Sequence, residues 1–149
     1  MEKIRYSTYR PYCFQFLFFD EILTHRQGQF PRIFPTQDSE GENYIICLTD
    51  RGSEKPFLAL MSNQITDLHI VGAGCSSQCF PFYNYDEDGS NRRENITNWT
   101  LEQFRTHYND TDISKWDIFH YIYAVLYHPE YRKKYEANLK REFLYRTLF

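Results

Sequence analysis

One stretch near the C-terminal end, residues 112–142, limits what this chain can fold into, because its periodicity, capping pattern and length all predict helix. Ser114 and Asp117 match a capping box, in which a hydroxyl and a carboxylate satisfy amide donors left free at a helix start. Apolar residues then recur at helical spacing, at Ile118, Phe119, Ile122, Val125 and Leu126. His128-Pro129 should end this helix, because a proline disfavours helical backbone in the residue before it.

Pro129 suits the first turn of a second helix, so a helical hairpin is expected. The second helix would carry one apolar stripe and a basic remainder. The stripe consists of Tyr131, Tyr135 and Leu139, and the basic residues are Arg132, Lys133, Lys134, Lys140 and Arg141. The hairpin is therefore predicted to be apolar inside and basic along its second arm.

The sequence upstream of the hairpin is predicted to form short strands joined by loops. Strands are expected over residues 6–19, 43–49, 67–71 and 79–85, and residues 57–61 should form either a strand or one helical turn. Residues 21–26 should form a short helical turn, 38–42 an acidic loop and 101–108 a helix. The aromatic residues of 6–19 favour a buried strand, and Pro81 indicates an edge position. The order of strands first and helices last predicts an α+β fold, with a mixed, aromatic-rich sheet of about four to five short strands packed on a C-terminal helical layer.

The length of 149 residues predicts a single domain, with a strand-rich part over residues 1–90 and a helical part over 91–149. The aromatic fraction of 19% argues against disorder. No apolar run is long enough to cross a bilayer, and the first residues lack the apolar core of a signal peptide, so a cytoplasmic location is expected. The four cysteines should then be reduced.

Residue patterns for catalysis or metal binding are absent from the sequence. Cys75 and Cys79 have no second Cys or His pair near them, whereas a zinc site needs about four ligands, so no metal is expected. There is no nucleophile elbow, phosphate-binding loop or zinc-protease motif. A small hydrolase would require a pocket that brings His69 or His120 against one of these cysteines.

The charge of the chain is unevenly distributed around a net value of −3. Residues 1–34 carry five bases and three acids, and residues 129–149 carry six and three, whereas residues 35–112 carry five bases and thirteen acids. A chain with basic ends can present a basic face to nucleic acid despite its net charge. A solvated surface of mixed charge fits the charge pattern equally well.

A consecutive series of short motifs carries a resemblance to a known family. The motifs are Tyr9-Arg10-Pro11-Tyr12, Pro31-Arg32-Ile33-Phe34-Pro35, Lys55-Pro56-Phe57, Asp67-Leu68-His69, Gln78-Cys79-Phe80-Pro81-Phe82-Tyr83, Arg93 to Trp99, and Ile113 to Glu142. The chain resembles, over residues 3 to about 143, the C-terminal target-recognition region of type ISP single-chain restriction-modification enzymes, and more weakly that of type IIG relatives. It departs from that pattern at Phe14 and Phe16 and again after Phe143.

The resemblance implies that a nuclease, a helicase-like motor and an adenine-N6 DNA methyltransferase precede this region in the parent enzyme. S-adenosylmethionine would belong to the parent, so this chain is expected to use no cofactor and to have no catalytic activity. The resulting hypothesis is a DNA target-recognition module, or a truncated remnant of one, with double-stranded DNA and the remaining domains of the enzyme as partners. The alternative is a protein-interaction domain that docks on other subunits of a restriction or DNA-processing complex.

Candidate DNA contacts follow from the chemistry of base edges and phosphates. Arginine and lysine pair with guanine, and asparagine or glutamine with adenine, which makes Arg26, Arg32, Arg51, Lys55 and Gln78 candidates for base contacts. Phosphate contacts are expected from Arg92, Arg93, Lys133 and Lys134. Each of these residues has the alternative role of an ordinary surface charge. Trp99 and Trp116 are expected to anchor the core of the helical layer.

Overall fold

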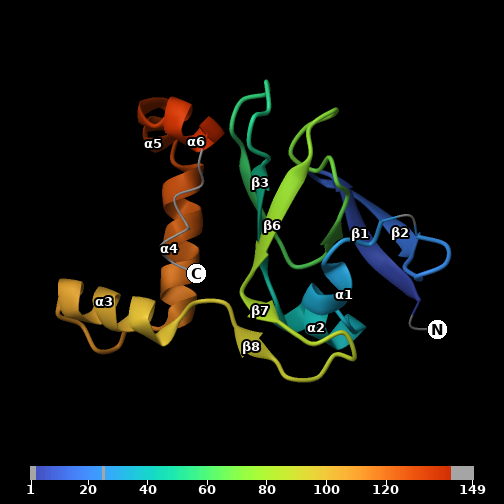
Figure 1. Cartoon of the computed structure of the whole chain (residues 1–149), viewed down its shortest axis with the longest axis horizontal. Coiled ribbons are helices and arrows are strands. Elements are labelled where there is room, and N and C mark those ends of the chain that lie inside the picture. Colours follow the sequence, from blue (N-terminus) through green and yellow to red (C-terminus); the bar gives the residue numbers. More distant parts are fainter. Residues whose placement is uncertain (1–2, 25, 142–149) are drawn as a thin grey trace.

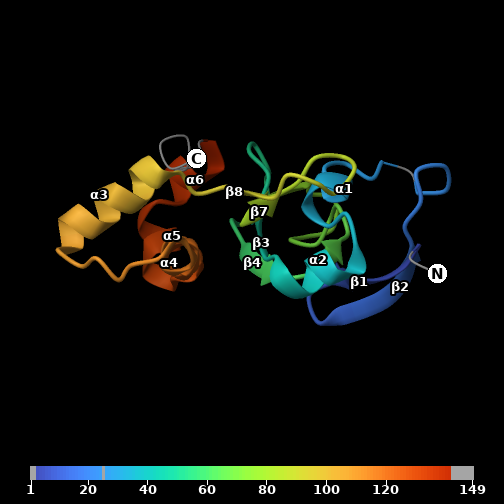
Figure 2. The same ribbon diagram turned by 90° about the horizontal axis from the view of Figure 1, so that it is seen from below.

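The computed structural model describes residues 3–24 and 26–141, so residues 144–149, where the sequence departs from the family pattern, lie outside the described part. The strand-rich part contains β1 (Ile4–Arg10), β2 (Cys13–Phe18), α1 (Phe30–Ile33), α2 (Gln37–Glu42), β3 (Ile45–Thr49), β4 (Ala59–Ser62), β5 (Ile65–Thr66), β6 (Ser77–Pro81), β7 (Tyr83–Asn84) and β8 (Arg93–Glu94). The helices α3 (Asn98–Tyr108), α4 (Lys115–Tyr127), α5 (Pro129–Lys134) and α6 (Glu136–Arg141) follow. The helices lie to one side of the strands in both views (Figures 1 and 2). The predicted α+β class is confirmed.

The strands form three small sheets rather than one mixed sheet. Their orders are β2-β1-β5, β4-β3-β6 and β7-β8. The first two sheets separate at a tight turn after β4, where the Gln64 N–H donates to the Ser62 hydroxyl (3.1 Å). Strand β4 pairs with β3, whereas β5, after this turn, pairs in parallel with β1. The expectation of one continuous sheet was therefore wrong, because a local turn redirects the chain between partners.

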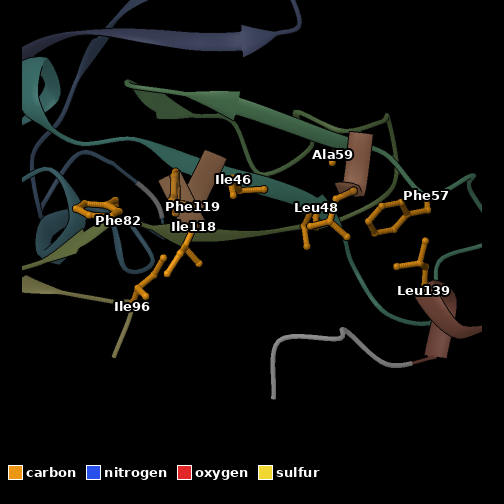
Figure 3. Close-up of a cluster of buried hydrophobic side chains, with 10 residues drawn as sticks. Ile46, Leu48, Phe57, Ala59, Phe82, Ile96, Ile118, Phe119 and Leu139 are labelled. Atoms are coloured by element: carbon orange, nitrogen blue, oxygen red, sulfur yellow. The ribbon is translucent and has the colours of Figure 1, made fainter. Parts of the chain in front are cut away.

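Strand β3, predicted as part of residues 43–49, is the centre of the fold. All five of its residues are buried. Ile46 and Leu48 belong to one apolar cluster, together with residues of α4 and α6, and Figure 3 shows them beside Phe119 and Phe57. Ile45 and Cys47 point into a second cluster with Ile33 and Phe34. The alternation of side chains along a strand therefore gives the molecule two cores on opposite faces of β3.

Helix α4 begins and ends where the sequence predicted. The Asp117 N–H donates to the Ser114 hydroxyl (3.2 Å), and the Ser114 N–H donates to the Asp117 carboxylate (2.8 Å), which completes the capping box. His128 and Pro129 end α4 and begin α5. The Trp116 ring stacks on Phe82 with centroids 3.7 Å apart, so the prediction that Trp116 is a core anchor is confirmed. Trp99 is 61% exposed, so the same prediction for Trp99 was wrong.

The second arm of the predicted helical hairpin is broken into α5 and α6 at Tyr135, which has φ −110° and ψ 18°. Tertiary contacts account for the break. Leu139 is buried, and Figure 3 shows it beside Phe57. The Gly52 N–H, from the turn after β3, donates to the Lys140 carbonyl (3.1 Å). Because residues 139 and 140 must meet the strands, the second arm does not continue as one straight helix along α4.

Several upstream predictions are also corrected. Residues 6–19 fold into a hairpin of β1 and β2 rather than one buried strand, with Tyr12 in the turn at φ 63°. Residues 67–71 form turns, not a strand. Of the predicted helical turn at 21–26, residues 21–24 and 26 form turns and a bend without a helix, and residue 25 lies outside the described residues. Residues 38–42 belong to helix α2, whose Thr36 hydroxyl accepts a hydrogen bond from Ser39 N–H. Pro81 does end an edge strand, as expected, because β6 lies at one side of its sheet.

No helix in residues 3–24 and 26–141 has both the length and the apolar character that a membrane span requires.

Candidate nucleic-acid interface

A groove with a volume of about 890 Å³ lies over the second apolar cluster. Its walls come from β1 and β2 on one side, residues 24 and 26–30 on another, and β5, residues 67–68 and β6 on the rest. Its floor is apolar, because Leu17, Phe19, Phe30 and Ile33 belong to the cluster underneath. The groove is therefore a shaped surface on a packed base, which is where fixed polar groups can recognise a ligand.

The rim and walls of the groove carry guanidinium and amide side chains. These are Arg26, Gln15, Gln27, Gln29 and Gln78. Arg26 is exposed and forms no ion pair with a described residue. Within the described part of the chain, the side chains of Gln15, Gln27 and Gln29 make no hydrogen bond to protein. These side chains match the donors and acceptors on the edges of guanine and adenine.

Gln78 is held in a fixed position in the groove by its neighbour. Its Nε2 donates to the Asp50 carboxylate at 2.8 Å, which orients the amide. Arg10 Nη1, from the end of β1, donates at 2.6 Å to the carboxylate of Asp67, which lines the groove. The Arg10 guanidinium also lies 4.2 Å from the centroid of the Tyr9 ring. Gln78 and Asp67 are therefore both ordered by charge-assisted hydrogen bonds.

The structure brings two of the nine predicted DNA-contacting residues, Arg26 and Gln78, to this one groove. The sequence analysis missed Gln15, Gln27 and Gln29. Gln27 and Gln29 form a Gln-Gly-Gln segment directly after Arg26, and Gln15 alternates with aromatic residues along β2. Period-2 alternation would have separated Gln15 from the aromatic face if 6–19 had been treated as a hairpin.

A second group of predicted residues gathers near β7 and β8, where each arginine has a carboxylate partner. Arg32 pairs with Glu87, Arg92 Nη1 lies 2.7 Å from Glu42, and Arg93 Nη2 lies 2.7 Å from Asp86. Hydrogen bonds from Asn91 and Arg93 lower the pKa of Asp86, and the charge of Arg32 adds to that effect.

The remaining predicted residues lie in the β3–β4 connection and on α5. Arg51 and Lys55 are exposed in that connection, which the Gly52 hydrogen bond joins to α6. Lys133 and Lys134 are exposed on α5, and the Lys134 ammonium lies 5.2 Å from the centroid of the Tyr135 ring. The nine predicted residues therefore fall into four places: the groove, the region of β7 and β8, the β3–β4 connection and α5.

The histidines and cysteines do not form a nucleophile and base pair in the described residues. His69 Nδ1 lies 3.0 Å from the backbone oxygen of Cys75, while the Cys75 sulfur accepts from the Ser53 hydroxyl. His120 stacks on Trp116. Cys47 and Cys79 are free thiols in hydrogen-bond contact with each other (Sγ to Sγ 2.7 Å), and burial raises the pKa of Cys47. No cluster of three metal-ligating side chains occurs among the described residues.

The family of the chain follows from a comparison with known sequence families. The pattern described as the Type ISP C-terminal specificity domain matches residues 1–144. This chain belongs to that family. The comparison confirms the resemblance to type ISP enzymes stated above, over the whole range expected, residues 3 to about 143. None of the curated protein sequences compared matches the specificity domain.

Solved structures similar to this specificity domain come from much longer chains. The chain in a cryo-EM structure of a DrdV–DNA complex shares 44% sequence identity with it, with a TM-score of 0.83. The match covers 95% of this chain and 13% of the DrdV chain. A nuclease-deletion mutant of the Type ISP restriction-modification enzyme LlaGI, in complex with a DNA substrate mimic, is 26% identical with a TM-score of 0.71, covering 95% and 11%. The ATP-dependent Type ISP enzyme LlaBIII bound to DNA shares the fold at 23% identity with a TM-score of 0.75, covering 95% and 9%. The specificity domain thus spans roughly a tenth of the length of these three chains.

Proposed function

We propose that this specificity domain reads the sequence of double-stranded DNA on behalf of a larger single-chain restriction-modification enzyme. The observation that carries the proposal is the groove, in which Arg26 and Gln78 stand with three further glutamines above an apolar floor. Similarity to a DrdV chain solved with DNA supports it independently. The domain acts as one unit, with its strand-rich part at 1–90 and its helical part at 91–149.

In this proposal the domain itself performs no chemistry. Nuclease and methyltransferase activities, and S-adenosylmethionine, belong to other parts of the parent enzyme. The enzyme acts on DNA in the cytoplasm.

The predicted residues take different roles in this function. Arg26 and Gln78 contact base edges, because guanidinium and amide groups at an open groove match the pattern of the major groove. Arg51, Lys55, Lys133 and Lys134 contact phosphates, because each is exposed and has no carboxylate partner among the described residues. Arg32, Arg92 and Arg93 contribute least, since each would first have to leave a carboxylate.

Selection from a random duplex library tests the proposal. The 149-residue chain should enrich one sequence, and binding of that sequence should weaken steeply as salt rises. The Arg26→Ala change should lower the affinity for the selected sequence by about 1–3 kcal/mol and relax the preference at one base position, because one base contact is lost. Fluorescence anisotropy on selected and scrambled duplexes measures both effects.

The matched control is Arg92→Ala, whose guanidinium is already bound by Glu42 and lies over the Tyr83 ring. It should leave the base preference unchanged. Lys133→Ala should weaken binding to all duplexes equally and lower the salt slope by about one. Absence of binding to any duplex at low salt would contradict the proposed function.

A further inference from the structure

The β1–β2 hairpin carries an uncovered aromatic surface on the face opposite the groove. The pairing register places Ile4 beside Phe18 and Tyr6 beside Phe16. The Tyr6 ring also stacks on Phe14 with centroids 5.5 Å apart. We refer to Ile4, Tyr6, Phe14, Phe16 and Phe18 as the aromatic face; the exposed fractions of these residues run from 44% to 77%.

The opposite side of the same hairpin is held tightly to the domain. Arg5 is 4% exposed and pairs with Glu40, and its Nη2 donates to the Thr36 carbonyl at 2.7 Å. Ser7 is buried, and Leu17 packs against the second apolar cluster. The hairpin is therefore anchored on one face, so its aromatic side chains are presented to the outside by a fixed support.

The chemistry of the aromatic face argues against duplex DNA as its occupant. Its positions carry no lysine or arginine to meet phosphates, which supply much of the affinity of a nucleic-acid surface. Contiguous apolar patches of this kind on a folded domain are typical of contacts with protein. Aromatic residues are also enriched in the centres of such contacts.

We infer that the aromatic face is the docking surface for the polypeptide that precedes the specificity domain in the larger single-chain enzyme. The family is described as a C-terminal domain, so the rest of a parent enzyme precedes it, and in the DrdV chain most residues lie outside the matched 13%. Strand β1 starts at Ile4, near the N-terminal limit of the family match over residues 1–144, so a preceding polypeptide would join the domain at this hairpin. The groove and the aromatic face belong to opposite sides of one hairpin, which fixes the DNA-reading surface relative to the rest of the enzyme.

Hydroxyl-radical footprinting in two settings tests this inference. The first is the 149-residue chain alone, and the second is a full-length DrdV chain in which residues 1–144 replace its 44% identical specificity domain. Oxidation of Tyr6, Phe14 and Phe16 should fall severalfold in the full-length chain. Trp99, which is 61% exposed on α3, is the internal control and should react in both settings. Buried Phe119 should stay unreactive in both, which verifies folding.

Equal oxidation of the aromatic face in the two settings would overturn the inference. Protection that already exists in the isolated chain and disappears on dilution would also overturn it, in favour of a second copy of the chain as occupant. Phe16→Asp provides the second measurement. It should restore oxidation of Tyr6 in the full-length chain while leaving the unfolding midpoint of the isolated chain unchanged, because residue 16 is 77% exposed there.

DNA binding by the isolated chain separates this inference from the proposed function. Phe16→Asp should not change the sequence that the isolated chain selects, because residue 16 does not line the groove. Arg26→Ala, in contrast, should not change the oxidation of the aromatic face. Either hypothesis can therefore fail while the other holds.

Discussion

Helix α4 and strand β2 are both rich in aromatic residues, yet they bury them very differently. In α4, Phe119 is 0% exposed and lies in the cluster formed with β3. In β2, Phe16 is 77% exposed. Both elements are amphipathic, so the difference lies in the partner: α4 finds the sheet of its own chain, whereas the aromatic face of β2 has no cover within the described residues. Aromatic content thus predicts a buried face only where a partner for that face is known.

The largest expected effect comes from removing a ring on the helical side. Phe119→Ala should destabilise the domain by about 3–5 kcal/mol, because it removes a fully buried side chain and leaves a cavity beneath Phe82 and Trp116. Urea unfolding followed by far-UV circular dichroism measures the change. Phe16→Ala is the matched substitution in β2 and should change stability by less than about 0.5 kcal/mol. Equal losses in the two variants would refute the contrast between the elements.

The anchored face of the hairpin should behave like the helical core. Arg5→Ala should lower the free energy of unfolding by about 3 kcal/mol. It leaves the Glu40 carboxylate without its ion-pair partner and the carbonyls of Phe34 and Thr36 without their donor. Burial already raises the pKa of Glu40 despite the nearby guanidinium. Lys3→Ala, at the exposed ion pair with Asp20, is the control and should cost less than about 0.5 kcal/mol. Chemical denaturation of both variants distinguishes an anchored hairpin from a loosely attached one.

Loss of the α4 cap should have an intermediate effect. Ser114→Ala should lower the free energy of unfolding by about 1 kcal/mol, because Asp117 N–H loses its acceptor at the helix start. Ser114→Thr retains a hydroxyl and should recover most of that loss. Thermal unfolding of the two variants checks the expectation, and a Thr variant as unstable as the Ala variant would argue against a capping role.

Acid should destabilise both regions only slightly. A hydrogen bond from Lys3, followed by the Ile22 amide, lowers the pKa of Asp20, and hydrogen bonds from Ser114 lower the pKa of Asp117. A lowered carboxyl pKa contributes stability that is present above the unfolded-state value near 3.8 and is lost as pH falls through the folded-state value. Glu40 acts in the opposite sense, because its pKa is raised. NMR titration should give midpoints below 3.8 for both aspartates; midpoints at or above that value would contradict the expectation.

The sequence predicted best what short-range chemistry decides. The limits of α4 depend on a hydroxyl, a carboxylate and a proline within the helix itself, so they could be predicted without knowledge of the fold. The break at Tyr135 could not, because it results from contacts of Leu139 and Lys140 with strands far away in sequence. The exposed face of β2 likewise depends on whether a partner covers it. The separation of the first two sheets starts at the local turn after β4, but the pairing of β5 with β1 joins strands far apart in sequence.

The candidate site was harder to predict than the fold. Residue type alone selected Arg26 and Gln78 together with arginines that turn out to be bound to carboxylates. The sequence shows where arginines occur but not whether a carboxylate binds them. The carboxylates that pair with Arg92 and Arg32 lie 50 and 55 residues away in sequence. Gln15 was missed because its face depends on the hairpin register.

Strand β3 serves two cores at once, and this affects how the domain opens. Separating either core from β3 exposes a strand whose five residues are all buried, so partial opening of one side also weakens the other. Backbone amides of Ile46 and Cys47 should therefore exchange their hydrogens only when the whole domain unfolds. Under the proposed function, a groove supported by such a strand would keep its shape between encounters with DNA.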